Sequence, residues 1–89
     1  MKSQRIKSVY SSIDDFGEVY INLDKILKER NITYNKLANS IGTDFDLISR
    51  YAKNKIVRTD LNILARICYV LDCDIPDLLV YRSPQKNEK

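Results

Sequence analysis

Four positively charged side chains lie close together near the middle of this 89-residue chain, and their chemistry suits phosphate binding. Arg50, Lys53, Lys55 and Arg58 fall within nine residues that contain no negative charge. Clusters of this kind attract polyanions such as the phosphate backbone of nucleic acids. The net charge is only +3, and residues 60–81 hold four aspartates against one arginine. The positive charge is therefore concentrated in one stretch.

The sequence lacks the usual residues of catalytic and metal sites. It has no histidine, which removes the commonest general base and the commonest zinc ligand. Its only cysteines, Cys68 and Cys73, do not have the C-x-x-C spacing of zinc sites and redox motifs. We interpret them as free, buried thiols, and we expect no metal, no cofactor and no enzymatic activity.

The basic cluster ends a stretch, Tyr34 to Asn54, that contains two short apolar patterns separated by Gly42. Both patterns have the i, i+1, i+4 spacing of one helical face: Leu37, Ala38 and Ile41, then Leu47, Ile48 and Tyr51. Glycine ends a helix at little conformational cost, and Asp44 can cap the next helix through its carboxylate. Two short helices joined so tightly must cross at a steep angle, which predicts a helix-turn-helix.

Further helices must position this pair, so that the predicted fold is all-α with five helices. Capping residues and apolar spacing predict them at residues 23–30, 34–41, 45–53 and 60–71, with a short fifth helix that has Pro76 in its first turn. The expected N-caps are Asn22, Thr33, Asp44 and Thr59.

The fourth predicted helix is apolar on two sides. One stripe contains Leu61, Leu64, Ala65, Cys68 and Leu71, and the other contains Ile63, Ile67 and Val70. Either the helix is central, with neighbours all round, or the second stripe packs on the N-terminal segment or on a second subunit.

The two ends of the chain are organised differently from the middle. Residues 1–18 form an extension, either a mobile arm or a strand or partner-binding segment, and residues 83–89 form a polar tail. Between them lies one domain, residues 19–82. The β-branched and aromatic tetrad 18–21 favours a short strand, and residues 80–82 either follow the fifth helix or extend as a strand beside residues 19–21.

From Val19 to Tyr81 the chain resembles the Cro/repressor-type (XRE family) helix-turn-helix domains, in particular their compact single-domain branch. The matching segments are residues 22–33, Leu37-Ala38, Gly42, Ile48-Ser49, Lys55, Thr59-Asp60, Leu64, Ile67-Cys68, Leu71, Cys73 and residues 77–79. The resemblance implies a domain whose third helix enters the DNA major groove while the second lies across the backbone.

The resemblance also implies which positions face the bases, namely Asp44, Phe45, Asp46, Ser49 and Arg50. Arg50 has the chemistry to fork to O6 and N7 of a guanine, and Phe45 can rest on a thymine methyl, fold back into the protein or meet a partner. The two aspartates suit the start of a helix, yet phosphates repel a carboxylate unless it meets a cytosine amino group.

The positions that would face phosphate are Tyr34, at the start of the second helix, and Lys53, Lys55 and Arg58, after the third. A tyrosine hydroxyl and three cations in these places would position the protein on DNA without reading its sequence.

Two functions remain after these exclusions. The first is a sequence-specific, repressor-like regulator that binds double-stranded DNA as a homodimer, with its interface in the N-terminal arm, the C-terminal segment or the fourth helix. The second is a protein-interaction module, antirepressor-like or antitoxin-like, that uses the same surface. No apolar run is long enough for a signal peptide or a membrane span, so we expect a cytoplasmic protein.

Overall fold

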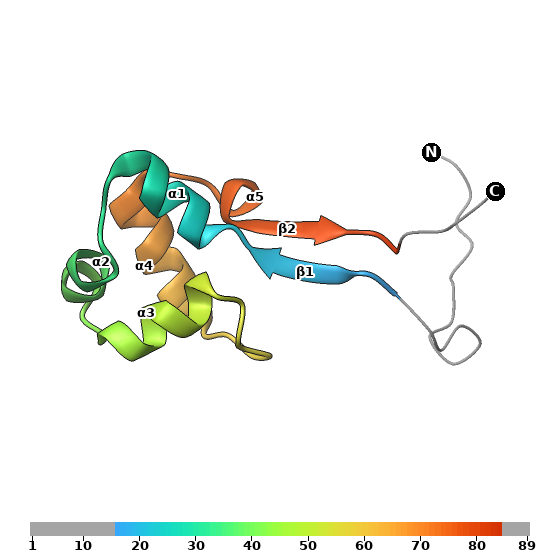
Figure 1. The fold of residues 1–89 in the computed structure, drawn as a ribbon, viewed down its shortest axis with the longest axis horizontal. Helices are drawn as coiled ribbons and strands as arrows, with labels where there is room; N and C mark the ends of the chain where they lie inside the picture. The colour runs from blue at the N-terminus through green and yellow to red at the C-terminus, as the bar shows by residue number, and fades with distance from the viewer. Residues whose placement is uncertain (1–15, 85–89) are drawn as a thin grey trace.

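The structure, a computed structural model, describes residues 16–84, which fold into five helices and two short strands. They are β1 (Glu18–Ile21), α1 (Leu23–Arg30), α2 (Tyr34–Ile41), α3 (Phe45–Ala52), α4 (Leu61–Leu71), α5 (Ile75–Leu78) and β2 (Leu79–Arg82). Figure 1 shows the helices gathered in one body and the strands extending from it as a narrow ribbon. The predicted five-helix fold is confirmed. Most of the predicted N-terminal extension and of the polar tail lies outside the described residues.

Capping side chains decide where α2 and α3 begin. Thr33 Oγ1 accepts a hydrogen bond from the Lys36 N–H at 3.1 Å, and Asp44 Oδ1 accepts one from the Leu47 N–H at 2.9 Å. Each bond satisfies a backbone donor that the first turn of a helix leaves without a partner. Both predicted caps are confirmed.

The start of α1 is held differently from the prediction. Asn22 occupies the N-cap position, but its side chain accepts no capping bond. Instead its Nδ2 donates to the Asp77 carbonyl at 3.4 Å, and its backbone N–H donates to the Leu78 carbonyl at 2.7 Å. The predicted N-cap position is confirmed, but the side chain of Asn22 joins α1 to α5 and does not cap the helix.

Gly42 makes the turn between α2 and α3. Its φ of 79° lies in the left-handed region, and its N–H donates to the Ala38 carbonyl. The Thr43 N–H donates to the same carbonyl at 2.8 Å. These bonds close the last turn of α2, so that α3 can begin after only three residues.

The N-cap of α4 is Asp60, one residue after the predicted Thr59. Asp60 Oδ1 accepts from the Asn62 N–H at 2.8 Å. The Thr59 hydroxyl lies 2.6 Å from the Tyr51 hydroxyl and ties the loop before α4 to α3. Threonine and aspartate are both good caps, so the sequence pattern alone does not decide between neighbours.

Only one side of α4 is buried against the rest of residues 16–84. Its buried residues, Ile63, Leu64, Ile67 and Leu71, come from both predicted stripes. Leu61 and Tyr69 are 78% and 86% exposed, so the expectation of neighbours all round is wrong for the described part of the chain.

No helix in residues 16–84 has the length and apolar character needed to cross a membrane.

The ribbon is antiparallel, and it pairs the two segments that the sequence suggested. Its register places Val19 opposite Tyr81 and Tyr20 opposite Val80. The Arg82 guanidinium lies 4.5 Å from the centre of the Tyr20 ring. The strand option for residues 80–82 is therefore confirmed, and α5 ends at Leu78.

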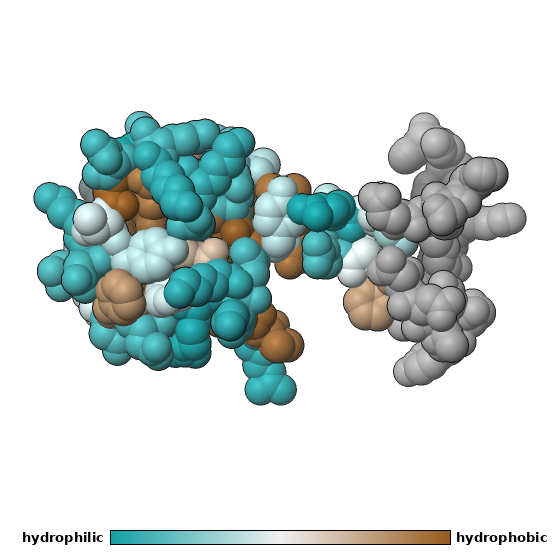
Figure 2. Space-filling model, in the orientation of Figure 1, coloured by the Kyte–Doolittle hydropathy of each residue, from teal (hydrophilic) through white to brown (hydrophobic). Residues whose placement is uncertain are grey.

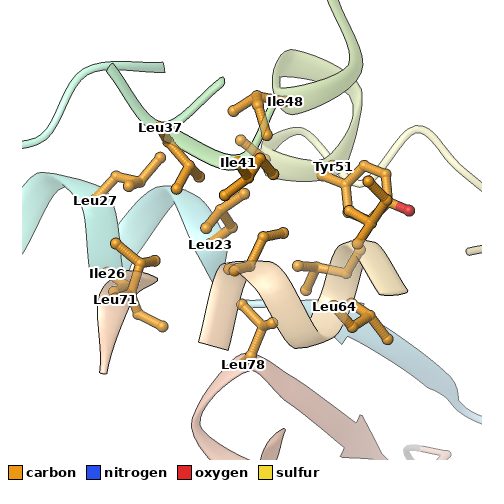
Figure 3. Close-up of a cluster of buried hydrophobic side chains, with 14 of the residues drawn as sticks. Leu23, Ile26, Leu27, Leu37, Ile41, Ile48, Tyr51, Leu64, Leu71 and Leu78 are labelled. Carbon is orange, nitrogen blue, oxygen red and sulfur yellow. The ribbon is translucent and has the colours of Figure 1, made fainter. Parts of the chain in front are cut away.

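The core draws a fully buried side chain from every helix (Figure 3). These residues are Leu23, Leu27, Leu37, Ile48, Ile67, Leu71 and Leu78. Burial of one such side chain contributes about 1.5–3 kcal/mol of transfer free energy. Ile48 and Tyr51 anchor α3 in this cluster, which fixes the orientation of its opposite face.

The two cysteines meet where α4 ends. Both are free and partly buried, and the Cys73 N–H donates to the Cys68 carbonyl at 3.0 Å. Burial, followed by the neighbouring Cys68 thiol, raises the pKa of the Cys73 thiol to about 11. A thiol with so high a pKa is almost entirely protonated at neutral pH, which makes it a poor nucleophile.

Candidate nucleic-acid interface

The outward face of α3 carries side chains of five kinds at helical spacing. Ile48, Tyr51 and Ala52 hold the opposite face in the core. Residues at i, i+1, i+4, i+5 and i+8 share one side of a helix. These positions, counted through the C-cap, hold Phe45, Asp46, Ser49, Arg50 and Lys53. The structure thus brings four of the five predicted base-facing residues together with one predicted phosphate contact.

Asp44 stands just before this face and has a structural role. Its backbone is extended, and its carboxylate accepts the Leu47 N–H as the N-cap of α3. The negative charge also complements the positive end of the helix dipole. The presence of this acid is explained without any contact to a base.

Asp46 and Arg50 form an ion pair one helical turn apart. Arg50 Nε donates to Asp46 Oδ2 at 3.2 Å. The side chains are 50% exposed for Arg50 and 80% exposed for Asp46, so the pair faces solvent. The negative charge of Asp46 on the outward face of α3 is therefore balanced by the arginine beside it.

Tyr34 and Phe45 bring the starts of α2 and α3 into contact. Their ring centroids are 5.7 Å apart, with a tilt of 43° between the planes. Aromatic pairs at this distance contribute about 0.5–1.5 kcal/mol beyond their area burial. Phe45 is still 49% exposed, so one side of its ring is open to a ligand.

The Tyr34 hydroxyl already has a partner within the domain. It donates to Asp24 Oδ1 at 2.8 Å, and Lys28 Nζ lies 3.0 Å from the other oxygen of that carboxylate. The Tyr34 hydrogen bond, and then the Lys28 one, lower the pKa of the Asp24 carboxyl. The same hydrogen bond raises the pKa of Tyr34. A phosphate contact would need this hydroxyl to leave Asp24, because the phosphate oxygens of DNA accept hydrogen bonds and have no proton to donate.

The loop after α3 presents the remaining cations. Lys53, Lys55 and Arg58 are exposed, and none of them forms an ion pair within residues 16–84. Figure 1 shows this loop extending from the helical body, and Figure 2 shows hydrophilic and hydrophobic residues together at its tip. Val57, within this loop, is fully exposed. As far as residues 16–84 are concerned, these cations can therefore contact phosphate without breaking an ion pair.

Asn54 anchors this loop to the ribbon. Its side chain accepts from the Ile21 N–H at 2.6 Å and donates to the Ile21 carbonyl at 3.0 Å. Its backbone has a φ of 58°, in the left-handed region that asparagine tolerates better than most residues. The neighbouring Lys55 N–H donates to the Arg50 carbonyl at 2.8 Å and closes the end of α3. The basic loop therefore leaves α3 in a defined direction.

Sequence reasoning missed two residues that shape this surface, Asp24 and Asn54. Asp24 precedes Lys28 by four residues, a spacing that indicates an ion pair but not the tyrosine that joins it. Asn54 stands in a short turn, where asparagine indicates a left-handed conformation but not a partner 33 residues away.

Four features together define a helix-turn-helix nucleic-acid-binding domain. They are the buried residues of α3, the glycine turn before it, its outward face, and a basic loop that forms no ion pair with any other described residue. A comparison with known protein families identifies which kind of helix-turn-helix domain this is. Residues 22–84 match the model of the Cro/C1-type helix-turn-helix DNA-binding domain, and the chain belongs to this family.

Known proteins that resemble the chain agree with this assignment. It is 30% identical over 67 residues to YozG of Bacillus subtilis (strain 168), an uncharacterised helix-turn-helix-type transcriptional regulator; the match covers 75% of this chain and 80% of YozG. A candidate DNA-binding protein from Bacteroides fragilis is 26% identical, with a TM-score of 0.63 over 70% of this chain and 98% of the other. The transcriptional regulator VanUg, at 24% identity, shares the fold with a TM-score of 0.63 over 89% of this chain and all of VanUg.

Proposed function

We propose that this protein is a sequence-specific transcriptional regulator that places α3 in the major groove of double-stranded DNA. The observation that carries the proposal is the outward face of α3, followed by a basic loop that has no ion pairs within the described residues. Membership of the Cro/C1-type family and the likeness to a regulator from Bacillus subtilis support it. Repression follows from occupation of an operator, and access to chromosomal DNA implies a cytoplasmic protein.

Each surface residue has a role in this proposal. Arg50 reads a guanine through O6 and N7, Ser49 bonds to any base edge, and Phe45 rests on a thymine methyl. Lys53, Lys55 and Arg58 contact phosphates, as does Tyr34 when its hydroxyl exchanges Asp24 for DNA. These phosphate contacts position the domain and supply affinity that depends on salt.

The operator is then a palindrome bound by a homodimer. One domain of this size covers a half-site, and two-fold pairing places two recognition helices about 34 Å apart, one turn of DNA. The exposed side chains of α4 and of the ribbon are the surfaces available for such pairing within residues 16–84.

Selection of bound sites from random double-stranded DNA tests the proposal. The wild-type protein should enrich a palindrome with a guanine in each half-site. Arg50→Ala should lose the preference at that position, a discrimination of about 1–3 kcal/mol, while binding to the rest of the site continues. An unchanged site preference in Arg50→Ala would rule out direct reading by this residue.

A protein-interaction module is the second candidate, because the exposed Phe45 lies between two acids in the sequence, the N-cap Asp44 and Asp46. In that case the surface binds a protein, and DNA fragments at low salt show no affinity for the wild-type domain. DNA binding that weakens steeply as salt rises excludes this alternative.

A further inference from the structure

The Asp46 carboxylate lies where phosphate repulsion makes an acid costly, yet it is the residue that holds Arg50. The contact is made by Arg50 Nε, at 3.2 Å from Asp46 Oδ2. In the free domain an exposed pair of this kind contributes only about 0–1 kcal/mol to stability. Its position on the outward face of α3 therefore has more to do with the orientation of the arginine than with the stability of the fold.

The chemistry of the guanidinium explains what this contact leaves available. Arginine has five N–H donors in a planar fork, one on Nε and four on the two terminal nitrogens. With Nε directed to Asp46, the terminal edge, Nη1 and Nη2, remains free for a bidentate contact. Guanine offers the matching pair of acceptors, O6 and N7, in the major groove.

We propose that Asp46 is a positioning residue that gives Arg50 its preference for guanine. The inference rests on the proposed function and goes beyond it, since it removes Asp46 from the base contacts. Exclusion of water in the groove strengthens the Asp46–Arg50 attraction, because the effective dielectric constant falls. The same carboxylate also keeps Arg50 from a neighbouring phosphate, so Asp46 lowers non-specific affinity as it raises specificity.

Matched variants separate the effect of Asp46 on the orientation of Arg50 from the effect of its negative charge. Asp46→Ala removes the contact, whereas Asp46→Asn removes the charge but keeps an oxygen that can accept from Arg50. Asp44→Asn removes the same charge two residues away and keeps the N-cap, because asparagine caps as well as aspartate. Site preference from random DNA is measured for each variant, together with affinity for sonicated genomic DNA and with thermal melting as a check of folding.

Three results support the inference. Asp46→Ala lowers the preference for guanine at the position lost in Arg50→Ala by about fivefold or more, within the range a bidentate contact supplies. Asp46→Asn retains more of this preference than Asp46→Ala. Asp44→Asn leaves the preference unchanged, while all three variants bind genomic DNA more tightly because an acid is lost.

Different results would overturn it. Full guanine preference in Asp46→Ala would show that Arg50 needs no positioning, and loss of a cytosine preference at another position would make Asp46 a base contact. Equal loss in Asp44→Asn and Asp46→Ala would assign the effect to charge alone. If Arg50→Ala keeps the wild-type preference, reading by Arg50 itself fails; if the wild-type domain binds no DNA, the proposed function fails. Each failure is thus distinguishable.

Discussion

The acidic side chains on or near the outward face of α3 are explained one by one by their partners. Asp44 caps α3, Asp46 pairs with Arg50, and Asp24 accepts the Tyr34 hydroxyl. The sequence alone indicates that acids beside the predicted recognition helix oppose DNA binding. In the structure each carboxylate is bound by a donor of the domain, which reduces the repulsion that a phosphate would meet.

The Asp24–Tyr34 hydrogen bond should make the stability of the fold depend on pH in the acid range. The pKa of the folded Asp24 carboxyl lies below its ordinary value of 3.8, so the unfolded chain takes up the proton first as pH falls. The stabilisation is therefore complete above pH 3.8 and is lost as pH falls below it. Asp24→Asn should melt at a lower temperature than the wild type at neutral pH, and the difference should shrink in acid.

Tyr34→Phe is the control for that experiment, since it removes the donor and leaves the carboxyl group in place. Its melting temperature should approach that of the wild type in acid in the same way. If the melting temperatures of the wild type and Asp24→Asn differ by the same amount at neutral and at acid pH, the Asp24 carboxyl is not the source of the pH dependence.

At the scale of elements, the side chain of Asn54 joins the ribbon to the end of α3. Asn54 follows α3, and its amide binds both backbone groups of Ile21 at the end of β1. An isolated two-stranded ribbon is only marginally stable in water. The link to Asn54 therefore steadies the base of the ribbon and the direction of the basic loop together.

Asn54→Gly isolates this link, because glycine adopts the same left-handed backbone without strain. The substitution should lower the free energy of unfolding by about 1–2 kcal/mol, the net contribution of two partly exposed hydrogen bonds. Urea denaturation measures the change.

Asn31→Gly is the matched control for Asn54→Gly. Asn31 has a similar φ of 61° at the end of α1, and its side chain makes no hydrogen bond within the described residues. The control should be close to neutral. Equal stability losses in the two variants would show that backbone freedom, not the Ile21 contact, is responsible.

For the molecule as a whole, the distribution of charge matters more than its sum. A net charge of +3 is too small to account for DNA binding by itself, so the positions of the positive charges decide where DNA can bind. The cations of residues 53–58 lie together at the end of α3, whereas exposed Lys25 and Lys28 are paired with acids on α1. Within residues 16–84 the end of α3 is therefore a place where cations without ion pairs are grouped, and we predict that phosphate approaches the domain there.

Lys55→Ala tests this arrangement through salt. The loss of one phosphate contact should weaken binding to all DNA sequences alike and reduce the slope of log K against log salt by about one per site. Lys25→Ala removes the same charge from a paired position and should leave the slope unchanged. Equal slopes for wild type and Lys55→Ala would exclude Lys55 from phosphate contact.

The sequence by itself determined the helices, most of their ends and the family. Caps such as Thr33 and Asp44, and the turn glycine Gly42, act on backbone groups within a few residues, so their effects are visible in the local pattern. The placement of Phe45, Asp46, Ser49 and Arg50 on one face also follows from helical spacing alone. The one cap misplaced by a residue, at Thr59, lies beside another residue that caps equally well.

Only the tertiary structure decided which partners the surface residues have. The bonds of Asn54 to Ile21, of Tyr34 to Asp24 and of Asn22 to Asp77 join residues 10 to 55 positions apart. Which side of α4 is buried, and the pairing of β1 with β2, depend equally on how distant elements pack. Local spacing carries no information about such contacts, because they form only once the buried side chains have brought the elements together.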